Sequence, residues 1–400
     1  SLLFLVLSPM LIRYGQEDRM YTLATTIALA ATYTLTFAVV SKRRLPWVIY
    51  GILVGLGMWT HYFMALIWLA HWAWRLYVTR QTGVRGKALR KAFFSKNWVL
   101  AHIVAVGLFL PWLPFMLIQL TIIQATGFWI GPVSADTVTN YMTNLLFYLQ
   151  HDQATGWYGV ALAVICVSLV VFGINLYRSL GKKQRQNYLL IVAIALVPVV
   201  LLLLVSLPPL RSSFVERYLI PSAAGFALFA GVTLALGIKK LRPIWRAVII
   251  GIVVVSMGFG ISNVYYFGNY NKNTNLKVTT GEVVREIAKK GKPGEPIVTQ
   301  SPWVFYEAVF YTTDEHPVYF IDATTEYIYG SLDMLKYSDQ HKIKDLPAFL
   351  SEHPVIWYIG YSADQPLAPP ADNLTQLQAF SIYDQIGQKD PYKAVQFRTY

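Results

Sequence analysis

The organisation of this sequence is set by one short polar stretch, Tyr14-Gly15-Gln16-Glu17-Asp18-Arg19-Met20-Tyr21. It lies between two apolar runs, residues 2–12 and 20–40, which can each enter a lipid bilayer. Ionised side chains are costly at the border of a membrane. Two carboxylates flanked by Arg13 and Arg19 therefore indicate a site that faces water or protein.

The composition excludes an ordinary soluble globule. The chain has 400 residues, of which 55% are hydrophobic and only 14% charged, and its mean hydropathy is +0.42. Soluble domains usually carry about 25% charged residues. Apolar runs of about 18–22 residues recur between short polar joints, which is typical of a polytopic α-helical membrane protein.

The net charge of +13 would suit a nucleic-acid-binding protein, but the positions of the charges argue against one. Lys and Arg gather in short loops between apolar runs, and residues 75–96 hold seven of them with no acid. Such loops face the cytoplasm by the positive-inside rule and can touch anionic lipid. We therefore expect a bilayer as partner and no nucleic acid. The single Cys166 lies in an apolar run, which excludes a disulfide framework.

Residues 1–265 are expected to form a transmembrane helical bundle of about nine spans, the first of them partial. Residues 46–79 form an apolar block interrupted near its middle, which predicts a tight helical hairpin with its tip at residues 60–63. The run 122–155 has no Lys or Arg and predicts an external loop in the membrane interface. The aromatic residues assigned to this interface are Phe128, Trp129, Tyr141, Phe147, Tyr148 and Trp157.

Residues 266–400 change to a mixed polar composition and are expected to fold as a small extracytoplasmic α/β domain. The protein would then be a multi-pass protein of the plasma (inner) membrane. Helices are predicted over residues 281–290 and 303–311, and strands over 296–300, 318–321, 355–361, 378–383 and 394–400.

The polar residues that this topology places at the outer membrane face are the candidate site. They are Arg13, Glu17, Asp18 and Arg19, then His61 and Tyr62, and finally Arg211, Glu216, Arg217 and Tyr218, with Tyr21 beside the first group. Arginines suit a phosphate or diphosphate, because the guanidinium fork pairs bidentately with its oxygens. A carboxylate beside them can bind a divalent cation, orient a hydroxyl or act as a base. The ordinary alternatives are a local ion pair, an interfacial histidine and an aromatic belt.

Three motifs resemble the bacterial membrane glycosyltransferases of the GT-C fold, the group of dolichyl-phosphate-mannose–protein mannosyltransferases and aminoarabinose transferases. The first is residues 8–23, where Asp18 replaces the family's usual small residue. The second is residues 57–63, and the third runs from Glu216 to Pro221. The motifs come in the family's order, and the likeness covers essentially residues 1–265.

The resemblance implies an inverting transfer of a sugar from a polyprenyl-phosphate donor at the outer membrane face, for cell-envelope glycosylation. The acceptor would be a glycan, a lipid or a protein, and a divalent cation could take part. The family's main catalytic acid lies in the first external loop. This chain opens at Ser1, part-way into an apolar segment, so that we expect the acid upstream of Ser1.

Glu17 and Asp18 are the candidate catalytic carboxylates of this chain, although the family's main catalytic aspartate has no counterpart in it. The candidate substrate-binding residues are Arg13, Arg19, Tyr21, His61, Tyr62, Arg217 and Tyr218. Three other functions stay open: a transporter or flippase of lipid-linked sugars, a membrane-anchored binding scaffold, and a different lipid-linked enzyme such as a ligase that joins whole glycans. A transporter would carry polar residues near the bilayer midplane, whereas the charges here lie at the ends of the spans.

Overall fold

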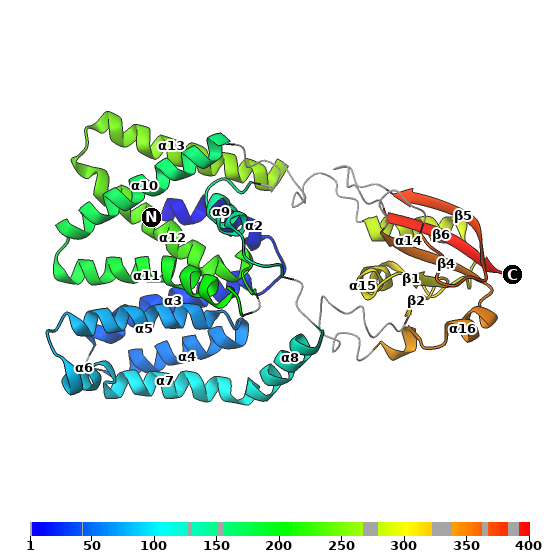
Figure 1. Ribbon diagram of the computed structural model, residues 1–400, viewed down its shortest axis with the longest axis horizontal. Helices are drawn as coiled ribbons and strands as arrows, with labels where there is room; N and C mark the ends of the chain where they lie inside the picture. The colour runs from blue at the N-terminus through cyan, green and yellow to red at the C-terminus, as the bar shows by residue number, and fades with distance from the viewer. Residues whose placement is uncertain are drawn as a thin grey trace. The chain divides into compact units, whose positions relative to one another are not determined.

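In the computed structural model, long apolar helices are followed along the chain by a C-terminal sheet (Figure 1). The structure describes residues 2–41, 43–126, 130–149, 156–210, 212–266, 279–321, 338–361, 367–382 and 392–400. By its contacts the chain divides into two compact units. One comprises Ser1–Leu117 with Ile130–Tyr270, and the other Ile118–Trp129 with Asn271–Tyr400.

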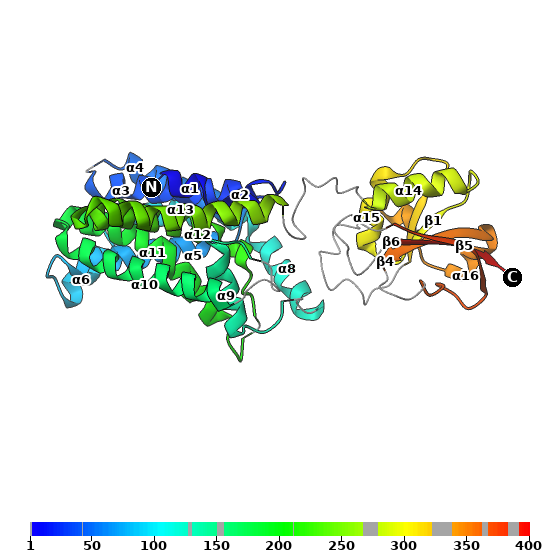
Figure 2. The same cartoon turned by 90° about the horizontal axis from the view of Figure 1, so that it is seen from above.

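Helices make up nearly all of the described chain up to residue 266, and their bounds are as follows. They are α1 (Leu2–Val6), α2 (Pro9–Gly15), α3 (Tyr21–Val40), α4 (Leu45–Thr60), α5 (Met64–Arg80), α6 (Gly86–Phe93), α7 (Lys96–Phe109), η1 (Leu110–Trp112), α8 (Leu113–Thr126), α9 (Ala135–Asn144), α10 (Gly156–Ser179), α11 (Lys182–Val205), η3 (Glu216–Leu219), α12 (Ile220–Gly237), η4 (Ile238–Lys240) and α13 (Pro243–Tyr266). The long helices of the first unit run along one common direction (Figures 1 and 2).

Six helices of the described chain are long and apolar enough to cross a membrane. They are Tyr21–Val40, Lys96–Thr121, Tyr158–Ser179, Lys182–Val205, Glu216–Gly237 and Pro243–Tyr266. The sequence predicts about nine spans, and the difference lies in shorter elements. Helices α4 and α5 have 16 and 17 residues, and the first apolar run is broken. A multi-pass helical membrane protein is consistent with these lengths.

The predicted hairpin is confirmed: α4 ends at Thr60 and α5 begins at Met64. The turn is tight because Gly57 has no side chain. A Cβ at Gly57 would lie 2.6 Å from Cγ of Met64, well inside van der Waals contact. His61, Tyr62 and Phe63, which lie between the two helices, form the tip of the hairpin.

The first apolar run is two short helices rather than the tail of one span. Pro9 stands at the start of α2, where its missing N–H costs no helical hydrogen bond. Ser8 caps this helix, and its Oγ accepts a hydrogen bond from the Leu11 backbone N–H at 3.5 Å. A proline preceded by a capping serine thus starts a new helix inside the run.

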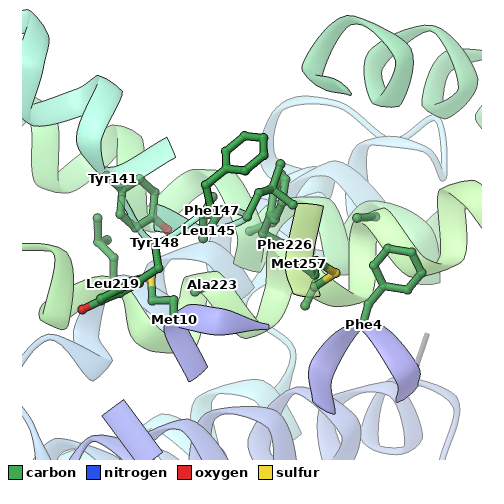
Figure 3. Packing of buried hydrophobic residues seen from close by; sticks show 14 of the residues in the cluster. Phe4, Met10, Tyr141, Leu145, Phe147, Tyr148, Leu219, Ala223, Phe226 and Met257 are labelled. Carbon is green, nitrogen blue, oxygen red and sulfur yellow. The ribbon is translucent and has the colours of Figure 1, made fainter. Parts of the chain in front are cut away.

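Residues 122–155 are expected from the sequence to form a loop in the membrane interface, and this expectation is wrong for three of its aromatic residues. Tyr141, Phe147 and Tyr148 are buried and belong to one cluster with Met10 and Leu219 (Figure 3). The physical reason is packing: the segment after α9 lies against α13, where the Asn263 amide donates to the Phe147 carbonyl at 2.8 Å. Aromatic bodies buried in this way leave lipid and water altogether. Phe128, Trp129 and the Trp157 side chain lie outside the described part of the chain.

The second unit contains a six-stranded sheet whose order is β3-β2-β1-β4-β6-β5. Strands β3, β2, β1 and β4 run parallel to one another. Strand β6 runs antiparallel to both of its neighbours, β4 and β5. The elements are α14 (Thr279–Lys290), β1 (Ile297–Thr299), α15 (Pro302–Tyr311), β2 (Val318–Ile321), η6 (Asp339–His341), β3 (Lys342–Ile343), α16 (Leu346–Glu352), β4 (Val355–Tyr361), β5 (Leu374–Ile382) and β6 (Tyr392–Thr399).

Both faces of this sheet are covered. Helices α14 and α15 pack on the face that carries Ile297 and Trp357, and α16 packs on the face that carries Val298 and Tyr358. Burial on two sides explains why β1 reads as an apolar run without alternation. The predicted α/β character of this segment is confirmed, and β3 and α16 are additions.

Close packing of α11 on α12 generates a stability prediction at Gly225. A Cβ there would lie 2.9 Å from the Ala195 backbone nitrogen and 3.0 Å from the Ile194 carbonyl carbon. Gly225→Leu should destabilise the protein by about 1–3 kcal/mol, because a helix backbone cannot move aside cheaply. Thermal unfolding in detergent measures the effect. Gly251→Leu is the matched control, since nothing lies within 4 Å of a Cβ at Gly251. Equal melting temperatures for the two variants would contradict this account of the packing.

Candidate functional site

The turn between α4 and α5 lies at the end of the helical unit away from α6 (Figure 1), and aromatic and charged side chains form a cluster around this turn. The start of α3, the hairpin tip and the η3–α12 segment contribute to it. Its lining residues are Tyr21, Ala24, His61, Phe63, Met64, Arg217, Tyr218 and Pro221. We call this set the tip cluster.

Stacked rings hold the tip cluster together. Tyr218 stacks on Phe63 with centroids 4.3 Å apart and an interplanar angle of 13°. The His61 ring lies 5.4 Å from Tyr218 and 5.6 Å from Tyr21. Three segments that are far apart in sequence therefore meet through the rings of Tyr21, His61 and Tyr218.

His61 is neutral at neutral pH. Burial, together with the positive charge of Arg217, lowers the pKa of His61 from 6.5 to about 4. The geometry agrees, because the His61 Nδ1 accepts a hydrogen bond from the Phe63 backbone N–H at 3.3 Å. The remaining proton is then on Nε2, which is a donor.

Glu216 ties the neighbouring segments to the tip cluster. The Tyr14 hydroxyl donates to its Oε1 at 2.8 Å, and the Asn144 amide donates to its Oε2 at 2.6 Å. The carboxylate thus joins α2, α9 and η3, and it fixes the backbone next to Arg217. Asn144 was missed by sequence reasoning, because nothing in its local pattern points to a partner that is 72 residues away.

An ion pair joins the last turn of α2 to the polar stretch that follows it. Arg13 Nη2 lies 2.8 Å from Glu17 Oε1, and the two side chains are only 8% and 16% exposed. Arg19 Nε lies 4.0 Å from Glu17 Oε2, and its side chain is 55% exposed. Glu17 therefore pairs closely with Arg13 and only loosely with Arg19. Tyr14 links this stretch to the tip cluster through an edge-to-face contact with Tyr21 at 5.6 Å.

Two predicted site residues are placed elsewhere. Asp18 is exposed, and the described part of the chain shows no hydrogen bond or ion pair to its side chain. The Tyr62 hydroxyl accepts from Trp112 Nε1 at 2.7 Å, and its ring packs edge-to-face on Phe109. Tyr62 thus faces α7 and η1 rather than the tip cluster. Arg211 lies outside the described residues.

The hollow within the tip cluster is small, about 10 Å³. This is close to the space that one water molecule needs. A phosphate or sugar must therefore approach from the rim, where Arg19 is exposed, or displace the rings of the tip cluster. Over the ranges that the structure describes, no group of three or more His, Cys, Asp or Glu side chains could hold a metal ion. A divalent cation at this site stays a prediction.

No protein-family model matches the chain, and comparisons with curated proteins and with solved structures find no match. The resemblance carried by the three motifs therefore stays a prediction.

The hydrogen bond from Tyr14 to Glu216 can be tested by stability. Tyr14→Phe removes a donor to a carboxylate and should cost about 1.5 kcal/mol, which lowers the melting temperature by a few degrees. Tyr33→Phe is the control, because Tyr33 is an exposed tyrosine on α3. The role given to Glu216 would be contradicted if the two variants melted at the same temperature.

The neutral state of His61 predicts a pH effect. Its folded pKa of about 4 lies below the ordinary 6.5, so the unfolded chain takes up the proton first as the pH falls. Its contribution to stability is complete above pH 6.5 and is lost progressively between pH 6.5 and pH 4. Wild-type protein should therefore lose more thermal stability between about pH 7 and about pH 5 than His61→Asn, whose Oδ1 can replace Nδ1 as acceptor. Parallel pH profiles would rule this out.

Proposed function

We propose that this chain is a membrane glycosyltransferase that moves a sugar from a polyprenyl-phosphate donor to an acceptor at the outer face of the membrane. The observation that supports it best is the tip cluster itself. Arg217 is held beside the stacked rings of Phe63 and Tyr218, next to the arginine-bearing stretch after α2.

Arg217 and Arg19 are suited to the donor phosphate. Arg217 is half-buried among rings, where a charge interaction is stronger than in water. Arg19 is exposed at the rim and can move toward a ligand. Glu17 then acts as a positioning residue, because its carboxylate already pairs with Arg13. A phosphate between two guanidinium groups would receive bidentate, charge-assisted hydrogen bonds.

The lipid and the sugar have matching surfaces. Met20 and Leu23 are exposed beside Tyr21 and offer apolar contact to a prenyl chain. The ring faces of Tyr218 and Phe63 are suited to the apolar face of a sugar. His61 can donate its Nε2 proton to a sugar hydroxyl, since Nδ1 is occupied as an acceptor.

The reaction that fits these groups is a direct displacement. The acceptor oxygen forms a bond to the anomeric carbon while the bond from that carbon to the phosphate oxygen breaks. The electron pair passes to the leaving phosphate, where the arginines stabilise the new charge. The proton of the acceptor passes to a carboxylate, a role that the family resemblance assigns to an acid in the first external loop. Attack from the face opposite to the phosphate inverts the anomeric centre.

Arg217 is the residue on which the proposal is tested. In the full-length protein, Arg217→Ala should lower the rate at which polyprenyl phosphate is released from polyprenyl-phosphate mannose or aminoarabinose by about 100-fold. Arg217→Lys should lie in between, because it keeps the charge and loses the fork. Arg44→Gln, an exposed arginine before α4, should match wild type.

The assay is run in liposomes with purified protein, and gel filtration checks that each variant is folded. The proposal fails if folded Arg217→Ala turns over as fast as wild type. It fails equally if wild type moves intact lipid-linked sugar across the bilayer without cleaving it, which is the behaviour of a transporter.

A further inference from the structure

A second surface, at the other end of the helical unit, has no role in the proposed function. It consists of an apolar groove of about 480 Å³ on α7, lined by Trp72, Phe94, Trp98, Val99, His102, Ile103, Val106 and Gly107. A hollow of about 400 Å³ adjoins it and is lined by Lys87, Arg90, Lys91 and Phe94. Phe94 lines both, so the two hollows lie on either side of one shared ring. We call them together the α6–α7 groove.

The walls of the groove are apolar even at His102. Its Nδ1 donates to the Trp98 carbonyl at 2.7 Å, and its Nε2 accepts from Trp68 Nε1 at 3.0 Å. Both ring nitrogens are satisfied within the protein, so the ring offers the groove no polar atom to bind. Ile103 and Val106 on the same helix are 63% and 50% exposed. They belong to a helix that is long and apolar enough to span a membrane.

Helix α6 presents three cations on one face. Lys87, Arg90 and Lys91 stand at positions i, i+3 and i+4, and all three are exposed. Among the described residues, no carboxylate lies within ion-pair distance of any of them. Their charges are therefore not neutralised within the described structure.

The helix is held in place by its last turn. Phe93 is buried and packs edge-to-face on Trp72 at 5.5 Å. Arg75 on α5 donates to the Ala92 carbonyl at 3.1 Å and to Ser95 Oγ at 3.4 Å. Figure 1 shows α6 at the ends of α5 and α7. The helix backbone that carries the cations is thus held in place beside the groove.

We propose that the α6–α7 groove binds an anionic phospholipid of the adjacent leaflet. The lipid phosphate would lie on Lys87, Arg90 and Lys91, and one acyl chain would lie in the groove below. The volume falls within the range of about 300–1,000 Å³ that ligand pockets occupy. A soluble acidic ligand would use the cations and leave the apolar groove empty, whereas a phospholipid uses both. Each Lys or Arg near an anionic bilayer surface contributes measurably to such binding.

The chain offers matched variants for a test. Lys87→Gln/Lys91→Gln removes two cations from α6. Lys182→Gln/Lys183→Gln removes two exposed cations from the start of α11, where they lie at the same end of the unit. Gly107→Leu fills the groove, because nothing lies within 4 Å of a Cβ at Gly107. Leucine also favours a helix more than glycine does, so this variant should fold.

The experiment measures lipid retained by the purified full chain in mild detergent, by native mass spectrometry. The probes are phosphatidylglycerol and phosphatidylcholine with identical acyl chains. Wild type should retain phosphatidylglycerol in preference to phosphatidylcholine. Lys87→Gln/Lys91→Gln should weaken phosphatidylglycerol retention by about ten-fold, and Lys182→Gln/Lys183→Gln should leave it unchanged. Gly107→Leu should weaken retention of phosphatidylglycerol with no fall in melting temperature.

Three results would overturn the proposal. Equal losses in the two double variants would mean that the basic end of the unit attracts lipid by diffuse charge alone. Full retention in Gly107→Leu would mean that the cations act without the groove. Equally strong retention of phosphatidylcholine and phosphatidylglycerol would mean that the anionic headgroup does not contribute to binding. None of these readouts depends on glycosyl transfer.

Discussion

The candidate site depends on the hydrogen bonds that the Glu216 carboxylate accepts. Its two oxygens accept hydrogen bonds from Tyr14 on α2 and from Asn144 on α9, which lie 202 and 72 residues away in the chain. A buried or half-buried carboxylate needs such donors, because an unpaired one is costly to remove from water. Once they are made, the next residue, Arg217, is fixed beside His61 and the stacked Tyr218. The hydrogen bonds to the Glu216 carboxylate therefore hold α2, α9 and η3 together.

Several elements could be predicted because they leave a local signal. The hairpin of α4 and α5 follows from an interrupted apolar block, and β1, β2 and β4 follow from short apolar runs bounded by turn residues. The order of the apolar runs predicts one membrane face for Tyr21, His61 and Tyr218, whereas their ring contacts are known only from the structure. The spacing of apolar residues, or the composition of a segment, is enough to predict such elements.

Other features could not be predicted, because they depend on tertiary packing. Tyr141, Phe147 and Tyr148 look like interfacial aromatics until α13 and α2 cover them. Tyr62 stands next to His61 in sequence, yet it faces Trp112, since neighbours at a turn point in different directions. The break before Pro9 did have a signal, a proline after a capping serine, and the long apolar run concealed it. Basic residues near α6 gave the sign of a partner, but only the structure shows the groove beneath them.

Binding of a lipid phosphate at the rim of the tip cluster can be measured by photocrosslinking. A polyprenyl phosphate that carries a photoreactive group on its first isoprene unit would be irradiated with the full-length protein in liposomes, and the modified peptides identified by mass spectrometry. We expect labelling within residues 13–24, 57–64 and 214–221. Unlabelled polyprenyl phosphate should compete with the probe and reduce this labelling. Labelling confined to residues 279–400, or to the middle of α10 to α13, would contradict binding at the tip cluster.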